Sequence, residues 1–115
     1  MTKPATIHLE RMRGDTFPMQ FSLNQSDGSA LPITGFTFLL TVDPSEGPDN
    51  ADSNLFQLTG TIVDGPGGVV SFAPSAIESN QLPGEYYYDI QMIDASLAVR
   101  TVAKGKFTFL QDITK

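Results

Sequence analysis

The sequence predicts an all-β protein built from two packed antiparallel sheets. Four segments alternate apolar and polar residues, and in the longest unbroken one, Thr16–Leu23, the apolar positions are Phe17, Met19, Phe21 and Leu23. Because successive side chains of a strand point to opposite faces, each segment indicates a strand with one dry face and one wet face. Short turns rich in Gly, Pro and Asp separate these segments. No long helical period intervenes, which excludes βαβ folds.

The length of the chain narrows the fold class further. A chain of 115 residues, 40% of them apolar and eight of them Phe, can bury a core without help from metals or disulfides. About seven strands in this length match the size of an immunoglobulin-like sandwich. We therefore expect residues 1–115 to form one sandwich domain, and a small closed barrel is the structural alternative.

Each strand is assigned from its alternation and from the turns that bound it. The predicted strands are Ala5–Met12, Thr16–Leu23, Phe36–Asp43, Leu55–Asp64, Val69–Phe72, Glu85–Ile93 and Leu97–Leu110. In the first strand, Ile7 and Leu9 are expected to face the core and His8 the polar side. Lys104-Gly105 is the expected position of a bulge in the last strand, because Gly inside a strand often marks one.

The connections carry their own signals. Asp27-Gly28 predicts a tight turn, because Gly accepts a positive φ without a steric penalty. The run Gly65–Gly68 allows only a tight connection between two strands. Pro44–Asn54 has no large apolar residue and is expected to be a flexible acidic loop.

One connection is expected to be helical. Pro74–Asn80 is long enough for a single crossover turn, in which Ser75 caps the helix and Glu78, three residues on, completes a capping box. The order Leu-Pro-Gly-Glu-Tyr that ends at Tyr86 is typical of a tyrosine corner, in which the hydroxyl binds upstream backbone. Tyr86 and Tyr88 are expected in the core, each with its hydroxyl on a backbone partner.

Composition excludes several classes of function. The net charge is −6, with seven Lys and Arg spread along the chain, so neither nucleic acid nor an anionic membrane is an expected partner. The absence of Cys excludes disulfides, a thiolate zinc site and a cysteine nucleophile. No apolar stretch reaches the roughly 20 residues that span a bilayer. The first residues lack the apolar core of a signal peptide.

No catalytic constellation is visible, and we expect a protein without enzymatic activity. His8, the only histidine, has no nucleophile or carboxylate partner in a recognisable motif. No cofactor is expected, and no metal site either. If a Ca²⁺ site exists, its ligands come from the acidic loop, although their spacing differs from that of an EF-hand. These candidate ligands are Asp43, Glu46, Asp49 and Asp52.

Two surface features invite a binding interpretation. Arg13-Gly14-Asp15 spells the tripeptide that integrins recognise, but between two strands it is expected to be an ordinary turn. Tyr87 alternates away from its two tyrosine neighbours and is the best single candidate for a contact residue, because exposed Tyr is enriched in interfaces.

Five segments of the chain, in order, resemble the landmarks of a known module: RGDTFPMQFSL, LPITGFTFLLTV, LTGTIVDGPGGVVSF, LPGEYYYDIQMID and VRTVAKGKFTFLQDITK. The module is the small immunoglobulin-like β-sandwich of tailed-bacteriophage virion proteins, and the chain is similar in particular to the N-terminal domain of siphophage upper-baseplate proteins. The resemblance runs from Arg13 to Thr114. It departs from the pattern at Pro32–Gly35, where Leu-Thr-Gly is more usual, and in the long acidic loop.

This resemblance implies a stand-alone structural protein of a phage or prophage virion, made in the host cytoplasm and located in the particle. A tail, baseplate or fibre-attachment component is the leading expectation, with a capsid-decoration or neck protein of the same fold as the alternative. Other virion proteins are the expected partners, and threefold or sixfold particle symmetry implies a homo-oligomer, a trimer or a hexamer. A different class of function, a receptor- or carbohydrate-binding module, would present Tyr87 with loops 24–31 and 44–54.

Unpaired edge strands are the expected docking surfaces, through strand addition. Ala5–Met12 and Phe107–Thr114 are expected near such edges, and either terminus can exchange onto a neighbour. The interface candidates are Tyr87, Ile7, Leu9 and Phe109.

Overall fold

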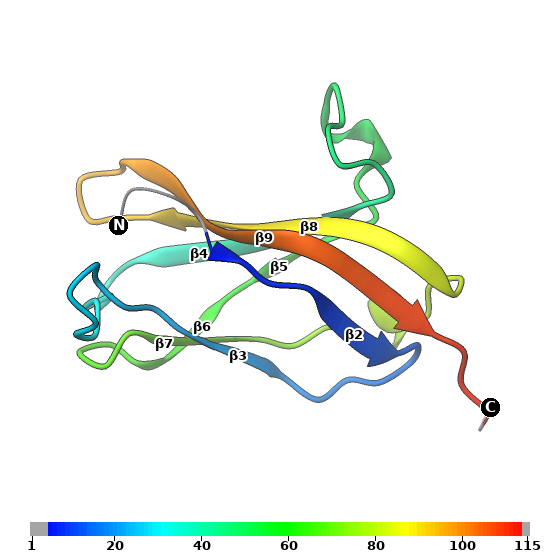
Figure 1. Cartoon of the computed structure of the whole chain (residues 1–115), viewed down its shortest axis with the longest axis horizontal. Helices are drawn as coiled ribbons and strands as arrows, with labels where there is room; N and C mark the ends of the chain where they lie inside the picture. The colour runs from blue at the N-terminus through cyan, green and yellow to red at the C-terminus, as the bar shows by residue number, and fades with distance from the viewer. Residues whose placement is uncertain (1–4, 114–115) are drawn as a thin grey trace.

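The structure is a computed structural model that describes residues 5–113. Residues 1–4, and Thr114 at the end of the predicted edge segment Phe107–Thr114, lie outside the described residues. Two layers of strands face each other across a common core (Figure 1). The described strands are β1 (Ala5–Thr6), β2 (Leu9–Met12), β3 (Met19–Ser22), β4 (Thr37–Asp43), β5 (Phe56–Thr59), β6 (Thr61–Asp64), β7 (Val69–Phe72), β8 (Gly84–Ile93) and β9 (Val99–Leu110).

The larger sheet has the order β1-β9-β8-β4-β5, with β2 also paired to β9, and the smaller sheet has the order β3-β7-β6. The predicted β-sandwich is therefore confirmed. Pairing is antiparallel throughout, except that β1 and β2 run parallel to β9. No helix in the described part of the chain is long and apolar enough to cross a bilayer.

Seven predicted strands become nine because two of them are interrupted. The first predicted strand breaks after Thr6 and resumes at Leu9. The fourth breaks at Gly60, where the chain leaves the larger sheet as β5 and enters the smaller one as β6. A Cβ atom at Gly60 would lie 2.8 Å from Val70 Cγ2 and 2.9 Å from Phe38 Cβ. Only glycine lets the backbone pass this close to core side chains.

The core lies between the sheets and follows the predicted alternation on β4, β8 and β9. Its largest fully buried side chains include Phe38, Leu40, Phe72, Ile90, Phe107 and Phe109. The ring of Phe109 packs edge-on against that of Tyr86, with 5.6 Å between the ring centroids, a favourable aromatic geometry. Phe109 is only 2% exposed. It therefore contributes to the core and does not present the docking surface for which it was a candidate.

The predicted strand Thr16–Leu23 is shorter in the structure, and Phe17 is not in the core. Its side chain is 58% exposed, and its ring lies over the guanidinium of Arg11, 4.4 Å from the Arg11 Cζ atom to the ring centroid. Arg11 is buried, and its Nη2 donates to the backbone carbonyls of Asp15 at 2.9 Å and Phe17 at 3.0 Å. Burial lowers the pKa of Arg11, an effect that the nearby Asp15 carboxylate partly opposes. Phe17 therefore covers this cation instead of filling the core.

The bulge in β9 lies two residues before the predicted position. Ile90 of β8 pairs with Ala103 and Gln91 pairs with Thr101, which leaves Val102 as the extra residue. Val102 and Ala103 are consequently both buried, as a bulge permits. Gly105 has a different purpose: a Cβ there would overlap the backbone carbonyl oxygen of Ile7.

The crossover after β7 follows its prediction closely. The helix α1 (Ala76–Ser79) begins with a complete capping box, in which Glu78 N donates to Ser75 Oγ at 3.1 Å and Ser75 N donates to Glu78 Oε1 at 2.8 Å. Tyr86 forms the predicted tyrosine corner, because its hydroxyl donates to the carbonyl of Leu82 at 2.7 Å.

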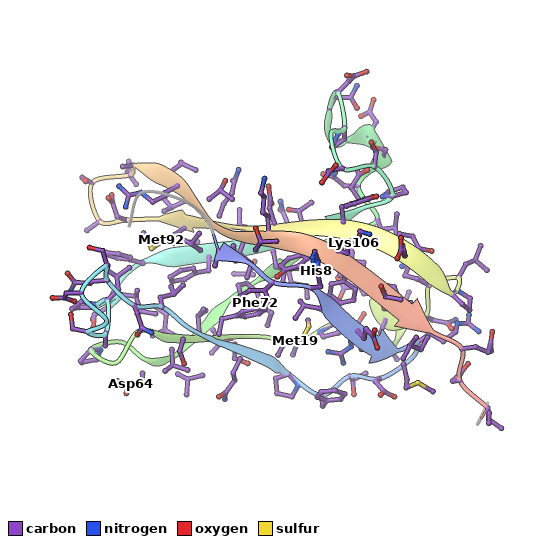
Figure 2. The ribbon with its side chains drawn as sticks, in the orientation of Figure 1. His8, Met19, Asp64, Phe72, Met92 and Lys106 are labelled. Atoms are coloured by element: carbon purple, nitrogen blue, oxygen red, sulfur yellow. The ribbon has the colours of Figure 1, made fainter. Side chains whose placement is uncertain are left out.

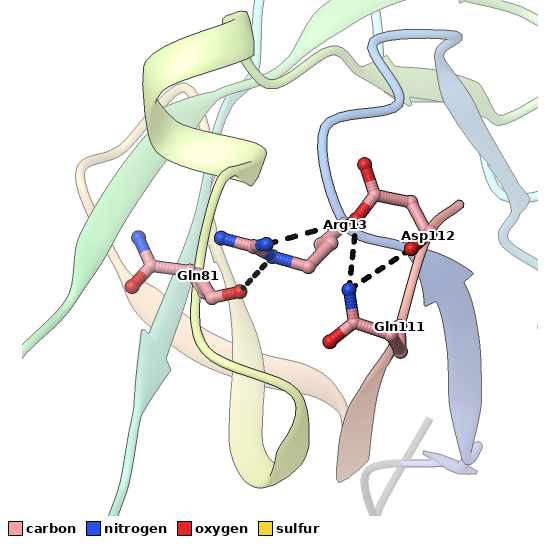
Figure 3. Close-up of polar contacts among 4 residues, drawn as sticks. All are labelled: Arg13, Gln81, Gln111 and Asp112. Atoms are coloured by element: carbon pink, nitrogen blue, oxygen red, sulfur yellow. Dashed lines mark hydrogen bonds and ion pairs between the residues drawn. The ribbon is translucent and has the colours of Figure 1, made fainter. Parts of the chain in front are cut away.

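The tripeptide at 13–15 is a structural corner of the molecule. Arg13 Nε donates to the carbonyl of Gln81 at 2.8 Å, and Arg13 Nη1 lies 3.6 Å from Asp112 Oδ1 (Figure 3). The backbone N–H of Gly14 donates to the carbonyl of Ser79 at 3.0 Å. These contacts fasten the crossover segment and the end of β9 to the turn between β2 and β3. The Arg13 guanidinium is thus engaged inside the fold.

Candidate functional site

The described residues form a groove on the outer face of the larger sheet, which we call the outer groove. It holds about 500 Å³ and is bounded on one side by loop 44–54, which projects from the sheet between β4 and β5 (Figure 1). Its floor consists of outward-facing side chains of β4, β5, β8 and β9: Thr41, Gln57, Tyr87, Asp89, Gln91 and Lys104. Concave sites of this size with convergent polar groups are typical of ligand pockets.

Asp43 holds the loop in position over the sheet. Its carboxylate accepts hydrogen bonds from Ser45 N at 2.8 Å, Ser53 Oγ at 2.7 Å and Asn54 Nδ2 at 2.7 Å. The side chain is 5% exposed. Burial raises the pKa of Asp43, but these three hydrogen bonds outweigh it and leave the pKa below its ordinary value of 3.8. The loop that was expected to be flexible is therefore anchored at both of its ends by one ionised carboxylate.

The strand register sets the charge pattern of the floor. On β8, Tyr87 pairs with Asp43 and Lys106, and Asp89 pairs with Thr41 and Lys104. Burial raises the pKa of Asp89. The groove therefore combines the ring of Tyr87, the ammonium groups of Lys104 and Lys106 and the half-buried carboxylate of Asp89. Glu46 adds a further carboxylate from the loop.

Tyr88, next along β8, points to the opposite face of the sheet, toward the core. From there it holds the backbone at Ile7, which lies between two residues of the groove lining. It is buried, and its hydroxyl donates to the carbonyl of Ile7 at 2.8 Å. Burial raises the pKa of Tyr88 to about 12. The backbone at Ile7 leads directly into His8, which with Thr6 lines the β9 side of the groove.

The candidate calcium ligands do not converge. Among the described residues, no group of three or more His, Asp or Glu side chains is placed to hold a metal ion. Asp43 uses both of its oxygens within the loop, Glu46 lines the groove, and Asp49 and Asp52 are exposed and lie outside its lining.

A second concavity, the inter-sheet groove, opens between β1 of the larger sheet and β3 of the smaller one. It holds about 400 Å³, and its lining includes Ile7, Phe21, Leu23, Val70, Ile90 and Val102. Ile7 was expected in the core but is 38% exposed, because no strand of the described residues continues the smaller sheet beyond β3 to cover it. Leu9 is partly buried against the core.

The interface candidates thus separate. Tyr87 lies in the outer groove together with Asp43 of β4 and Glu46 of the loop, whereas Ile7 lies in the inter-sheet groove. Sequence reasoning missed Asp89 and Lys104, which complete the floor. Both residues occupy polar positions in the alternating pattern of β8 and β9, which is a signal in the sequence that they face outward. Only the strand register shows that they lie opposite each other.

Comparison with known proteins bears on the fold alone. No protein-family model and no curated protein matches the chain. Among solved structures, CopC from Methylosinus trichosporium OB3b is similar, with a TM-score of 0.53, 9% sequence identity, and coverage of 94% of this chain and 88% of that chain. At this identity the likeness supports the sandwich architecture, and no ligand or activity is carried over.

Proposed function

We propose that this chain is a non-enzymatic structural protein of a bacteriophage or prophage virion, a tail, baseplate or fibre-attachment component that works through protein–protein contacts. The ordered resemblance of five sequence segments to such modules suggests this class. The sandwich and the tyrosine corner that those segments predict are present in the fold.

The observation that carries the proposal is the state of the sheet edges. Within residues 5–113, β3, β5 and β6 are each paired on one side only, and the remaining edge of the larger sheet is occupied by the short segments β1 and β2. Open edges are templates for pairing with another chain. A small sandwich that leaves them accessible is suited to assembly by strand addition.

The proposal is tested by electron microscopy of phage particles made with and without this chain. A tail, baseplate or fibre-attachment role predicts that particles made without it lack the distal tail structure or its fibres. The alternative, a capsid-decoration or neck role, predicts intact tails with bare or detached heads. Complete, infectious particles formed without the chain would contradict both.

The outer groove supports a second candidate, a receptor- or carbohydrate-binding module. Tyr87 offers a ring with a polar tip, and Gln57, Asp89, Gln91 and Asn54 offer planar amide and carboxylate groups in the same concavity. This combination suits a ligand with hydroxyl groups on an apolar frame, such as a sugar.

This candidate is tested on a glycan array with three forms of the protein. The wild type and Ile77→Ala, which removes an 87% exposed side chain on α1 outside the groove, are expected to bind the same glycan. Tyr87→Ala is expected to lose it. Equal binding by Tyr87→Ala, or no binding by the wild type, would exclude a sugar site in this groove.

A further inference from the structure

The N-terminal edge strand is interrupted at Ile7 and His8, and the interruption is bridged by three specific hydrogen bonds. Ile7 N donates to the carbonyl of Lys104 at 2.8 Å, and the Tyr88 hydroxyl donates to the carbonyl of Ile7 at 2.8 Å. In the third bond a side chain takes the place of a backbone acceptor: Lys106 N donates to His8 Nδ1 at 3.0 Å. Figure 2 shows His8 on the stretch between β1 and β2, beside Lys106 on β9.

The bond at His8 requires a neutral imidazole. Nδ1 can accept a hydrogen bond from the Lys106 N–H only while it carries no proton of its own, so the ring proton must be on Nε2. In the imidazolium form both ring nitrogens are donors, and the bond cannot exist. Protonation of His8 therefore removes one of the three contacts at the interruption.

The environment of His8 adds to this effect. Lys104 and Lys106 line the outer groove with it, so that a charge gained on His8 joins two cations of the neighbouring strand. The other charged or titratable groups of the groove are Asp43 at the end of β4, Glu46 from the loop, and Tyr87, Tyr88 and Asp89 from β8. On its own side of the interruption, Glu10 follows on β2.

Little else holds the segment before β2. Ala5, Thr6 and His8 are exposed, and Ile7 is only partly covered. In the part of the chain that the structure describes, β1 pairs with β9 over two residues, Ala5 with Ala103 and Thr6 with Lys104. Segments with few buried apolar contacts open at low free-energy cost.

The receiving edge is shaped for this particular segment. Gly105 has no Cβ, which lets the carbonyl of Ile7 approach β9, and Tyr88 presents its hydroxyl to that carbonyl from inside the sandwich. A second copy of the chain carries the same residues at the same positions. It can therefore make these contacts in place of the resident segment, which is the condition for strand exchange.

We propose that residues Ala5–His8 form a displaceable edge strand: protonation of His8 releases it from β9, and on return to neutral pH the vacant edge takes the same segment of a second copy. The partner in this proposal rests on the proposed assembly role. The release step rests only on the contacts of His8.

The release step is tested by hydrogen exchange of the Lys106 amide at pH 7.5 and pH 5, measured by NMR and expressed as a protection factor. Loss of one hydrogen bond predicts a drop of about tenfold for the wild type at pH 5. His8→Asn keeps an acceptor oxygen near the position of Nδ1 but does not titrate, so its protection factor should be the same at both values. His8→Ala should lack the protection at both. Equal protection of the wild-type amide at both pH values, or an acid-induced loss in His8→Asn as well, would overturn the release step.

The exchange step is tested by light scattering after incubation at pH 5 and return to pH 7.5. The wild type is expected to show dimers or larger species in proportion to protein concentration, and His8→Asn is expected to stay monomeric under the same treatment. A wild type that returns to monomer at every concentration would overturn exchange with a second copy. These measurements use the isolated protein, so they can fail while the virion role stands, and the particle test can fail while they succeed.

Discussion

At the scale of single residues, Tyr88 makes the most testable contact, because one hydroxyl joins β8 to the N-terminal edge strand. Its pKa is raised to about 12 by burial, so the folded chain keeps its proton where an unfolded chain, with a pKa near 10, has lost it. Between these two values the unfolded state binds fewer protons, and stability falls as pH rises through this window.

Alkaline titration of the phenol absorbance measures this directly. One of the three tyrosines is expected to ionise only near pH 12, and Tyr88→Phe should remove that late step. The variant should also lose about 1 kcal/mol of unfolding free energy at neutral pH, as is typical of one hydrogen bond. Titration curves of wild type and variant that differ only in amplitude across the whole range would contradict the assignment.

Asp43 is the residue on which the wall of the outer groove depends. Asp43→Asn puts an amide donor where three donors converge, and we expect loop 44–54 to open, with proteolysis within it at least several-fold faster than in the wild type. Asp49→Asn, an exposed change in the same loop, is the matched control. Folding lowers the pKa of Asp43 below 3.8. Asp43 therefore contributes to the stability of the fold at pH values above its pKa in the unfolded chain, and the contribution is lost as pH falls through its lower pKa in the folded chain. Equal cleavage of the two variants would show that Asp43 does not hold the loop.

At the scale of elements, the switch of the chain from β5 to β6 depends on Gly60. A Cβ there would meet Val70, Phe38 and Phe72 at 2.8 to 3.0 Å, so Gly60→Ala should cost about 1 to 3 kcal/mol of unfolding free energy. Gly47→Ala is the control, because its Cβ would meet nothing within 4 Å. Urea denaturation compares the two, and similar midpoints for both variants would contradict a packing constraint at the switch.

The same element shows why strand prediction has limits. The alternation from Leu55 to Asp64 is continuous in sequence, and its period is unchanged when the strand passes from one sheet to the other. The alternation of apolar and polar residues predicts which side chains face the core, but it does not predict with which strands, or in which sheet, the segment pairs. The break between β1 and β2 is similar. It depends on Tyr88, which is 81 positions from Ile7, and on Gly105, which is still further along the chain, and no local signal at Ile7 or His8 points to either residue.

At the scale of the whole molecule, features that act within a few residues were predictable and features that depend on register were not. The capping box at Ser75, the tyrosine corner at Tyr86 and the turn at Asp27-Gly28 follow from local chemistry, and the structure contains all three. Phe17 is exposed, although the alternation predicts it inside, because Arg11, a cation buried on β2, takes the inner position.

The candidate site divides in the same way. Tyr87 and the acidic loop were identifiable from sequence, but their meeting in one groove depends on the pairing of β4 with β8, which sets Asp43 opposite Tyr87. Asp89 and Lys104 needed the register of β8 against β9 as well. The residues of the candidate site are therefore brought together by strand pairing and not by any single sequence motif.

The most direct test of the proposed role is the copy number of this chain in virions purified through a density gradient, measured by quantitative mass spectrometry against the major capsid protein. A structural component of a symmetric particle predicts a constant number per virion that is a multiple of three or six. Absence of the chain from purified particles, or a number that varies from one preparation to the next, would contradict it.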